Sequence, residues 1–132
     1  MSVSSGVTLA TRIHAISYAC DDVLLFELRS LDGEPLPAFT PGAHVDVHIP
    51  GGMSRSYSLL NDAAERHRYL LGIKRESASR GGSAWMHDVA RPGEQLEIAG
   101  PRNHFALDES APHSVLIAGG IGITPLWSMA QR

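Results

Sequence analysis

The sequence predicts a mainly β fold, an antiparallel sheet or barrel, followed by the beginning of an α/β unit. Two observations carry this prediction. Over the first two thirds of its 132 residues, apolar and polar residues alternate in short segments that turn residues separate, a pattern typical of half-buried antiparallel strands. Near residue 113 the pattern changes to a continuous apolar run and then a glycine-rich turn, as expected for a parallel strand buried on both faces.

Six strands are expected, and the segment 44–49 shows the alternation most clearly. Val45, Val47 and Ile49 face one way there, while the polar residues between them face the other. Turns are expected near Asp21 and near Asn61. The six predicted strands cover Val7–Ile16, Val23–Arg29, His44–Ile49, Arg55–Leu60, Tyr69–Arg75 and Gln95–Ala99.

Two helices are expected. A short one covers Ala84–Val89, entered through a glycine turn and with Ser83 as its N-cap. The second covers Leu126–Gln131, with Pro125 near its first position, and follows a predicted strand at Ser114–Ala118. We therefore expect a barrel domain over residues 1–110 and the start of a truncated α/β domain over residues 111–132.

Composition argues against several classes of protein. Eleven basic and 14 acidic residues give a net charge of −3 without a block of like charge, which disfavours a dedicated nucleic-acid binder. The single Cys20 provides neither an internal disulfide nor the thiolates of an iron–sulfur cluster, and it lacks a cationic neighbour that would activate it. No leader pattern and no apolar run of ~18 residues is present, so a cytoplasmic protein without a membrane partner is expected.

Two polar segments are candidates for ligand binding. The turn Gly81–Ser83, with Arg80 before it and a helix after it, suits an anion such as phosphate; a mobile turn with a helix cap is the simpler interpretation. In the predicted strand 55–58, Arg55 and Tyr57 share one face and Ser56 and Ser58 the other. Without further context, Arg55 is a solvated edge residue and Tyr57 a half-buried packing residue.

Other sites are less well supported. The turn 119–125 resembles a dinucleotide fingerprint, but Pro125 stands where the third glycine should be. His44, Asp46 and His48 share a strand face and could bind a metal, although a solvent-facing polar stripe explains them more simply. No G-x-S-x-G segment is present, which disfavours a hydrolase.

Five segments, taken in order, resemble the flavin-binding half of the ferredoxin-reductase superfamily, in particular its phthalate dioxygenase reductase and vanillate demethylase reductase group. They are Pro41–Val47, Arg55–Leu59, Ser77–Ser83, Pro101–Phe105 and Gly119–Pro125. The resemblance covers nearly the whole chain from about Thr8 onward. It implies a six-stranded Greek-key flavin-binding barrel with one capping helix, followed by the first strand and helix of a nicotinamide-binding domain.

The resemblance also implies roles for individual residues. Arg55 would bind the flavin phosphate, Tyr57 would pack on the isoalloxazine, and the Ser58 hydroxyl would lie near N5. A forked guanidinium suits a phosphate, and an aromatic face suits a flat ring. The remaining cofactor-binding candidates are Ser56 in the same strand, Ile73 and Lys74 through their main chain, Arg80, Gly81, Gly82 and Ser83 at the phosphate, and Thr124 from the second domain. Ser58 and Thr124 are the catalytic candidates.

The implied function is that of a reductase component of an aromatic-ring oxygenase or demethylase system. The R-G-G-S turn is similar to that of members that bind FMN, so FMN is expected over FAD. In full-length relatives a hydride passes from NADH to the flavin, and single electrons continue to a [2Fe–2S] centre and a terminal oxygenase. The cluster cysteines are absent from these 132 residues, so this chain would carry only the flavin step. The alternatives are a non-catalytic flavin or phosphate-ligand module and an interaction domain that self-associates through the apolar run 115–118.

Overall fold

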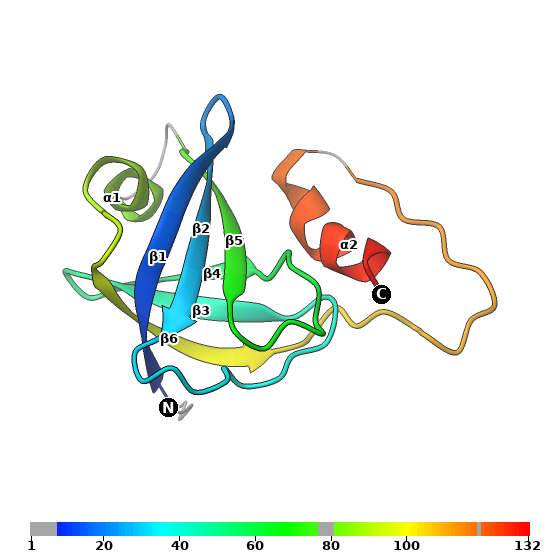
Figure 1. Ribbon diagram of the computed structural model, residues 1–132. Coiled ribbons are helices and arrows are strands. Elements are labelled where there is room, and N and C mark those ends of the chain that lie inside the picture. Colours follow the sequence, from blue (N-terminus) through cyan, green and yellow to red (C-terminus); the bar gives the residue numbers. More distant parts are fainter. Residues whose placement is uncertain (1–7, 77–80, 119) are drawn as a thin grey trace.

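All six predicted strands form, and together they make one sheet (Figure 1). The computed structural model describes residues 8–76, 81–118 and 120–132; Val7, the predicted start of the first strand, lies outside these ranges. The strands are β1 (Thr8–Cys20), β2 (Val23–Ser30), β3 (His44–Ile49), β4 (Met53–Ser58), β5 (Tyr69–Lys74) and β6 (Gln95–Arg102).

The sheet curls into a Greek-key barrel. Its strand order is β4-β3-β6-β1-β2-β5, and every pair of neighbours is antiparallel. Irregularities in the β1–β2 register, between Ile13 and Ala15 and between Tyr18 and Cys20, are the kind that bend a long strand. The two ends of the order meet where Leu59 bridges Leu71. The prediction of a mainly β, six-stranded antiparallel fold is confirmed.

Alternation along the strands builds the core as predicted. In β3, Val45 and Val47 are completely buried and Ile49 nearly so, whereas the polar residues between them are partly exposed. The largest fully buried side chains of the described residues come from five of the strands and the segments next to them. They are Tyr69, Phe26, Ile13, Leu28, Leu36, Leu59, Leu71, Ile73, Met86, Ile98, Val45 and Val47.

Helix α1 (Gly82–Asp88) covers one end of the barrel and begins two residues earlier than predicted. The predicted N-cap was wrong: Gly81 occupies this position in the left-handed region, and Ser83 lies inside the helix. Glycine adopts this conformation without steric cost. The Ser83 hydroxyl instead accepts a hydrogen bond of 2.9 Å from the Glu76 main-chain N–H, which ties α1 to the segment after β5.

The strand predicted at Ser114–Ala118 does not form. This segment is extended but unpaired and exposed, with Val115 and Ile117 about 85% accessible. A parallel strand is stable only beside neighbours of its own sheet, and no described strand lies next to it. The predicted second helix does form, but it begins three residues earlier than predicted: a short 3-10 turn η1 (Gly120–Gly122) leads into α2 (Ile123–Ala130), and Pro125 is its third residue. Helix α2 lies near β5 (Figure 1). No helix among the described residues has the length and apolar character needed to cross a membrane.

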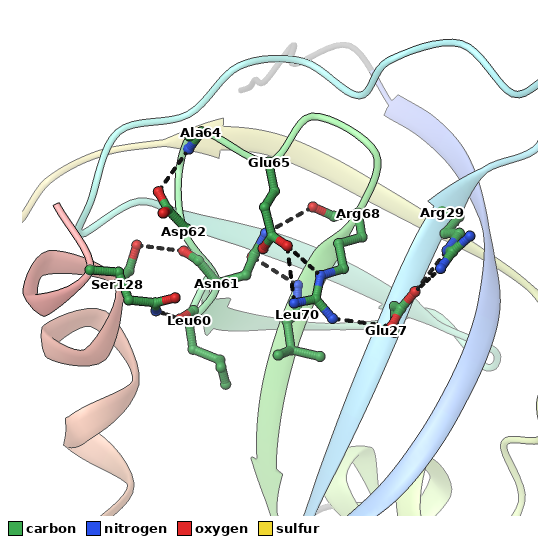
Figure 2. A network of polar contacts seen from close by, with 11 residues as sticks. Glu27, Arg29, Leu60, Asn61, Asp62, Ala64, Glu65, Arg68, Leu70 and Ser128 are labelled. Carbon is green, nitrogen blue, oxygen red and sulfur yellow. Dashed lines mark hydrogen bonds and ion pairs between the residues drawn. The ribbon is translucent and has the colours of Figure 1, made fainter.

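An ion-pair network fastens β2 to the loop before β5 (Figure 2). Glu27 pairs with Arg29 at 2.7 Å and with Arg68 at 3.2 Å, and Arg68 also pairs with Glu65 at 3.1 Å. Burial alone would raise the pKa of Glu27, but the bonds and charges of Arg29 and Arg68 outweigh it and lower this pKa below its ordinary value. The ionised carboxylate therefore stabilises the fold.

We expect Glu27→Gln to lower the free energy of unfolding at neutral pH by about 1 kcal/mol. Because the folded-state pKa of Glu27 is lowered, its contribution is present above the unfolded pKa and is lost as pH falls through the folded value. Urea denaturation should show a gap in unfolding free energy between wild type and variant at neutral pH, and this gap should close once the pH falls below the folded-state pKa of Glu27. Glu76→Gln, at an exposed glutamate, is the control. A gap that persists in acid would show that the effect is not electrostatic.

Candidate functional site

The barrel is least closed between β4 and β5, and most of the predicted site residues flank this opening. Strand β4 pairs along its length with β3, and β5 pairs along its length with β2. Between the β4 and β5 segments, strand pairing among the described residues is limited to one bridge, from Leu59 just after β4 to Leu71 in β5. We call this opening the β4–β5 seam. Helix α1 packs against both strands at one end of it.

Arg55 is held against the first residue of α1. A Cβ atom added to Gly82 would lie 3.0 Å from the Cγ and 3.1 Å from the Nε of Arg55, so a side chain at this position would require Arg55 to shift. The guanidinium donates to the Ser54 carbonyl oxygen at 2.9 Å. Among the described residues it forms no ion pair with a carboxylate. A cation without an anionic partner is thereby fixed at the seam, as a phosphate site requires.

Two other residues of the predicted phosphate loop, Gly81 and Ser83, flank Gly82 at the start of α1. Gly81 has a positive φ of 108° and lies next to the Met53 side chain. Ser83 is buried, and its hydroxyl oxygen accepts the Glu76 N–H bond. Arg80 lies outside the described residues.

Tyr57 and Ser58 follow Arg55 along β4 but face opposite ways, as the alternation predicts. Tyr57 is partly buried and packs against the core. Burial raises the pKa of Tyr57, and the nearby Arg55 only partly offsets this, so the phenol stays protonated. Ser58 instead opens with Ser56 onto a pocket of about 340 Å³. The structure thus brings Arg55 and the glycine turn together, and separates both from the two serines.

The pocket at Ser58 is polar and contains two imidazoles. Its lining is Gly42, His44, Ser56, Ser58, His104 and Phe105. His44 is the cross-strand partner of Ser58, and its ring centre lies 5.5 Å from that of His104. Burial lowers the pKa of His44, with Arg102 and His104 adding to the effect, so His44 is neutral at neutral pH.

Of the polar residues on β3, Asp46 is held by two side-chain contacts. Asp46 accepts a hydrogen bond from Ser56 and forms an ion pair with Arg102, which engages both of its carboxylate oxygens. The described residues contain no group of three or more His, Cys, Asp or Glu suited to a metal ion.

The two predicted site residues of β5, Ile73 and Lys74, contact their surroundings in different ways. The Ile73 side chain is fully buried, and its carbonyl oxygen lies 2.7 Å from Nε2 of His87 in α1. Lys74 is exposed and lines a larger, mainly apolar pocket of about 480 Å³ together with Thr124 and Trp127. Thr124 is buried, and its methyl group would lie 3.2 Å from a Cβ placed on Gly72. The start of α2 therefore contacts β5 directly, next to the seam.

Sequence reasoning did not place Gly42, His44 or His104 at the candidate flavin site; His44 was considered only as a possible metal ligand. These residues lie in the segments 41–47 and 101–105, whose motifs were recognised without a chemical role. The signal was their alternation with buried residues, which places His44 on the same sheet face as Ser58. Pairing of β3 with both β4 and β6 then brings the two segments together.

No family model matches the chain, but curated proteins and solved structures do. It is 63% identical to phenoxybenzoate dioxygenase subunit beta of Ectopseudomonas oleovorans over 98% of this chain and 42% of that protein. It is 48% identical to phthalate dioxygenase reductase of Burkholderia cepacia over 84% of this chain and 34% of that protein. A solved phthalate dioxygenase reductase, described as a modular structure for electron transfer from pyridine nucleotides to [2Fe–2S], superposes with a TM-score of 0.92 at 44% identity, over 95% of this chain and 39% of that one.

The chain belongs to the ferredoxin-reductase superfamily. Within it, the matches place this ferredoxin-reductase chain in the phthalate dioxygenase and vanillate demethylase reductase group, as the five motifs predicted. It spans between 34% and 42% of the length of these curated relatives.

Proposed function

We propose that this chain binds FMN along the β4–β5 seam and serves as the flavin station of an oxygenase or demethylase reductase. The observation that carries the proposal is the cradle of Arg55 and Gly82. Arg55 has no carboxylate partner among the described residues, and it packs so closely on Gly82 that a side chain there would displace it. Its position at the end of the seam suits a phosphate whose attached ring extends along β4.

The other residues have roles that follow from their positions. Gly81, Gly82 and Ser83 would border the phosphate, with the Ser83 hydroxyl as a further donor. Tyr57 would offer its partly buried ring to one side of the flavin, and the main chain of Ile73 and Lys74 would border the flavin edge. Ser58 and Thr124 would supply hydroxyl groups from β4 and α2, and Ser56 would contribute to the polar wall at Ser58.

Bound flavin supplies the ability to accept a hydride and release single electrons. In the whole protein, we propose NADH as the donor, and a [2Fe–2S] centre followed by a terminal oxygenase as acceptors. We propose FMN over FAD on the R-G-G-S form of the turn, of which Gly81–Ser83 are described. Titration with FMN, FAD and riboflavin separates these ligands by their phosphates.

A flavin titration tests the proposal. We expect the purified chain to quench FMN fluorescence on binding and to prefer FMN over riboflavin, which lacks the phosphate. NADH would then bleach bound flavin if the chain supports reduction, and leave it oxidised if the chain is a binding module alone. If no flavin binds at all, the reductase and the flavin-binding module are both ruled out, and the interaction-domain alternative remains. Sedimentation would then test self-association through the exposed run 115–118.

A further inference from the structure

Helix α2 is fastened to the segment that follows β4. The Ser128 hydroxyl donates a hydrogen bond of 2.8 Å to the Asn61 carbonyl oxygen, and the Gln131 side-chain amide donates one of 2.9 Å to the Leu60 carbonyl oxygen. Ser128 is completely buried, and Figure 2 shows it beside Asn61. Buried hydroxyls are retained where they satisfy a specific acceptor, which identifies the Ser128 bond as a built attachment; the part-buried Gln131 bond adds a second contact to the same segment.

The segment that receives these bonds is itself fixed to β5. Asn61 is almost fully buried; its side-chain oxygen accepts from the Leu70 N–H and its side-chain nitrogen donates to the Arg68 carbonyl oxygen, each at 3.0 Å. The Leu60 N–H also donates to the Leu70 carbonyl oxygen at 3.0 Å. Asn61 therefore holds β5 with its side chain and α2 with its carbonyl group (Figure 2).

The same helix face carries Thr124. Residues four apart lie on one face of a helix, so the Ser128 bond fixes the face from which Thr124 meets Gly72 on β5. The methyl group of Met129, the next residue along α2, also approaches Gly42 of the Ser58 pocket. Displacement of α2 would therefore change the packing at Gly72 on β5 and at Gly42 beside the Ser58 pocket.

We propose that Ser128 and Gln131 are positioning residues that hold Thr124 against β5 beside the β4–β5 seam. The attachment itself depends only on the contacts above. Its effect on a bound flavin rests on the proposed function, so the two parts are tested by separate measurements.

Hydrogen exchange of the flavin-free chain tests the attachment. We expect Ser128→Ala and Gln131→Met each to speed amide exchange over residues 120–132 about tenfold, since each removes one buried or half-buried bond, while the barrel strands keep their protection. Ser110→Ala, which removes an exposed hydroxyl that donates to Asp108 and to no other described residue, is the matched control. Unchanged exchange in α2 would overturn the proposal.

A double-mutant cycle tests whether Ser128 acts through Thr124. We expect Ser128→Ala to shift the visible spectrum and midpoint potential of bound FMN, Ser128→Thr to restore both, and Thr124→Val to abolish the effect of Ser128→Ala. Additive shifts would refute positioning through Thr124. If FMN does not bind to the wild-type chain, the proposed function fails, and the exchange experiment still decides the attachment.

Discussion

Arg55→Ala is expected to weaken FMN binding about 10- to 100-fold, the range for loss of charged hydrogen bonds to a phosphate. Arg55 forms no ion pair with a described carboxylate, so its positive charge is available to a ligand. Fluorescence titration measures the change. Arg55→Lys keeps the charge but loses the planar fork, and should fall between wild type and alanine.

Riboflavin is the decisive control for this prediction. Because it carries no phosphate, its affinity should be the same for wild type and Arg55→Ala. Arg91→Ala, at an exposed arginine in the turn before β6, should leave FMN affinity unchanged and corrects for the loss of net charge. Equal weakening of FMN and riboflavin would mean that Arg55 shapes the ring site and does not bind the phosphate.

The strands were predictable because their burial is decided locally. Val45, Val47 and Ile49 alternate with polar residues, and the observed β3 has the predicted boundaries. Strand boundaries that depend on pairing with another strand were harder to predict. Strand β6 extends beyond its predicted end to Arg102 because Arg102 still pairs with His44 of β3. The strand expected at 114–118 failed for the complementary reason, since an apolar run becomes a strand only where another strand accepts it.

The sequence motifs indicated which residues to consider for the candidate site, but they did not predict how those residues lie relative to one another. Alternation placed Arg55 and Tyr57 on one face, but contact between Arg55 and Gly82 depends on how α1 closes the barrel end. Ser83 shows the limit most clearly: its sequence position fits an N-cap, yet its hydroxyl receives the Glu76 N–H instead. The attachment of α2 through Ser128 joins residues 67 apart in sequence, which no local pattern could indicate.

Gly42→Ala is expected to lower the free energy of unfolding by about 3 kcal/mol or more. Gly42 has a φ of +99°, and a Cβ there would lie 2.0 Å from the Phe105 carbonyl oxygen, so the main chain itself must move. That movement would also open the pocket at Ser58, which both residues line.

Gly33→Ala separates the two causes of this loss. Gly33 also has a positive φ, of +78°, but nothing lies within 4 Å of a Cβ placed there, so its substitution should cost only the backbone term of about 1 kcal/mol. Urea denaturation of both variants gives the difference, which measures the close approach of the segments 41–47 and 101–105. Equal losses would mean that these segments separate easily and that the Ser58 pocket is not a rigid feature of the barrel.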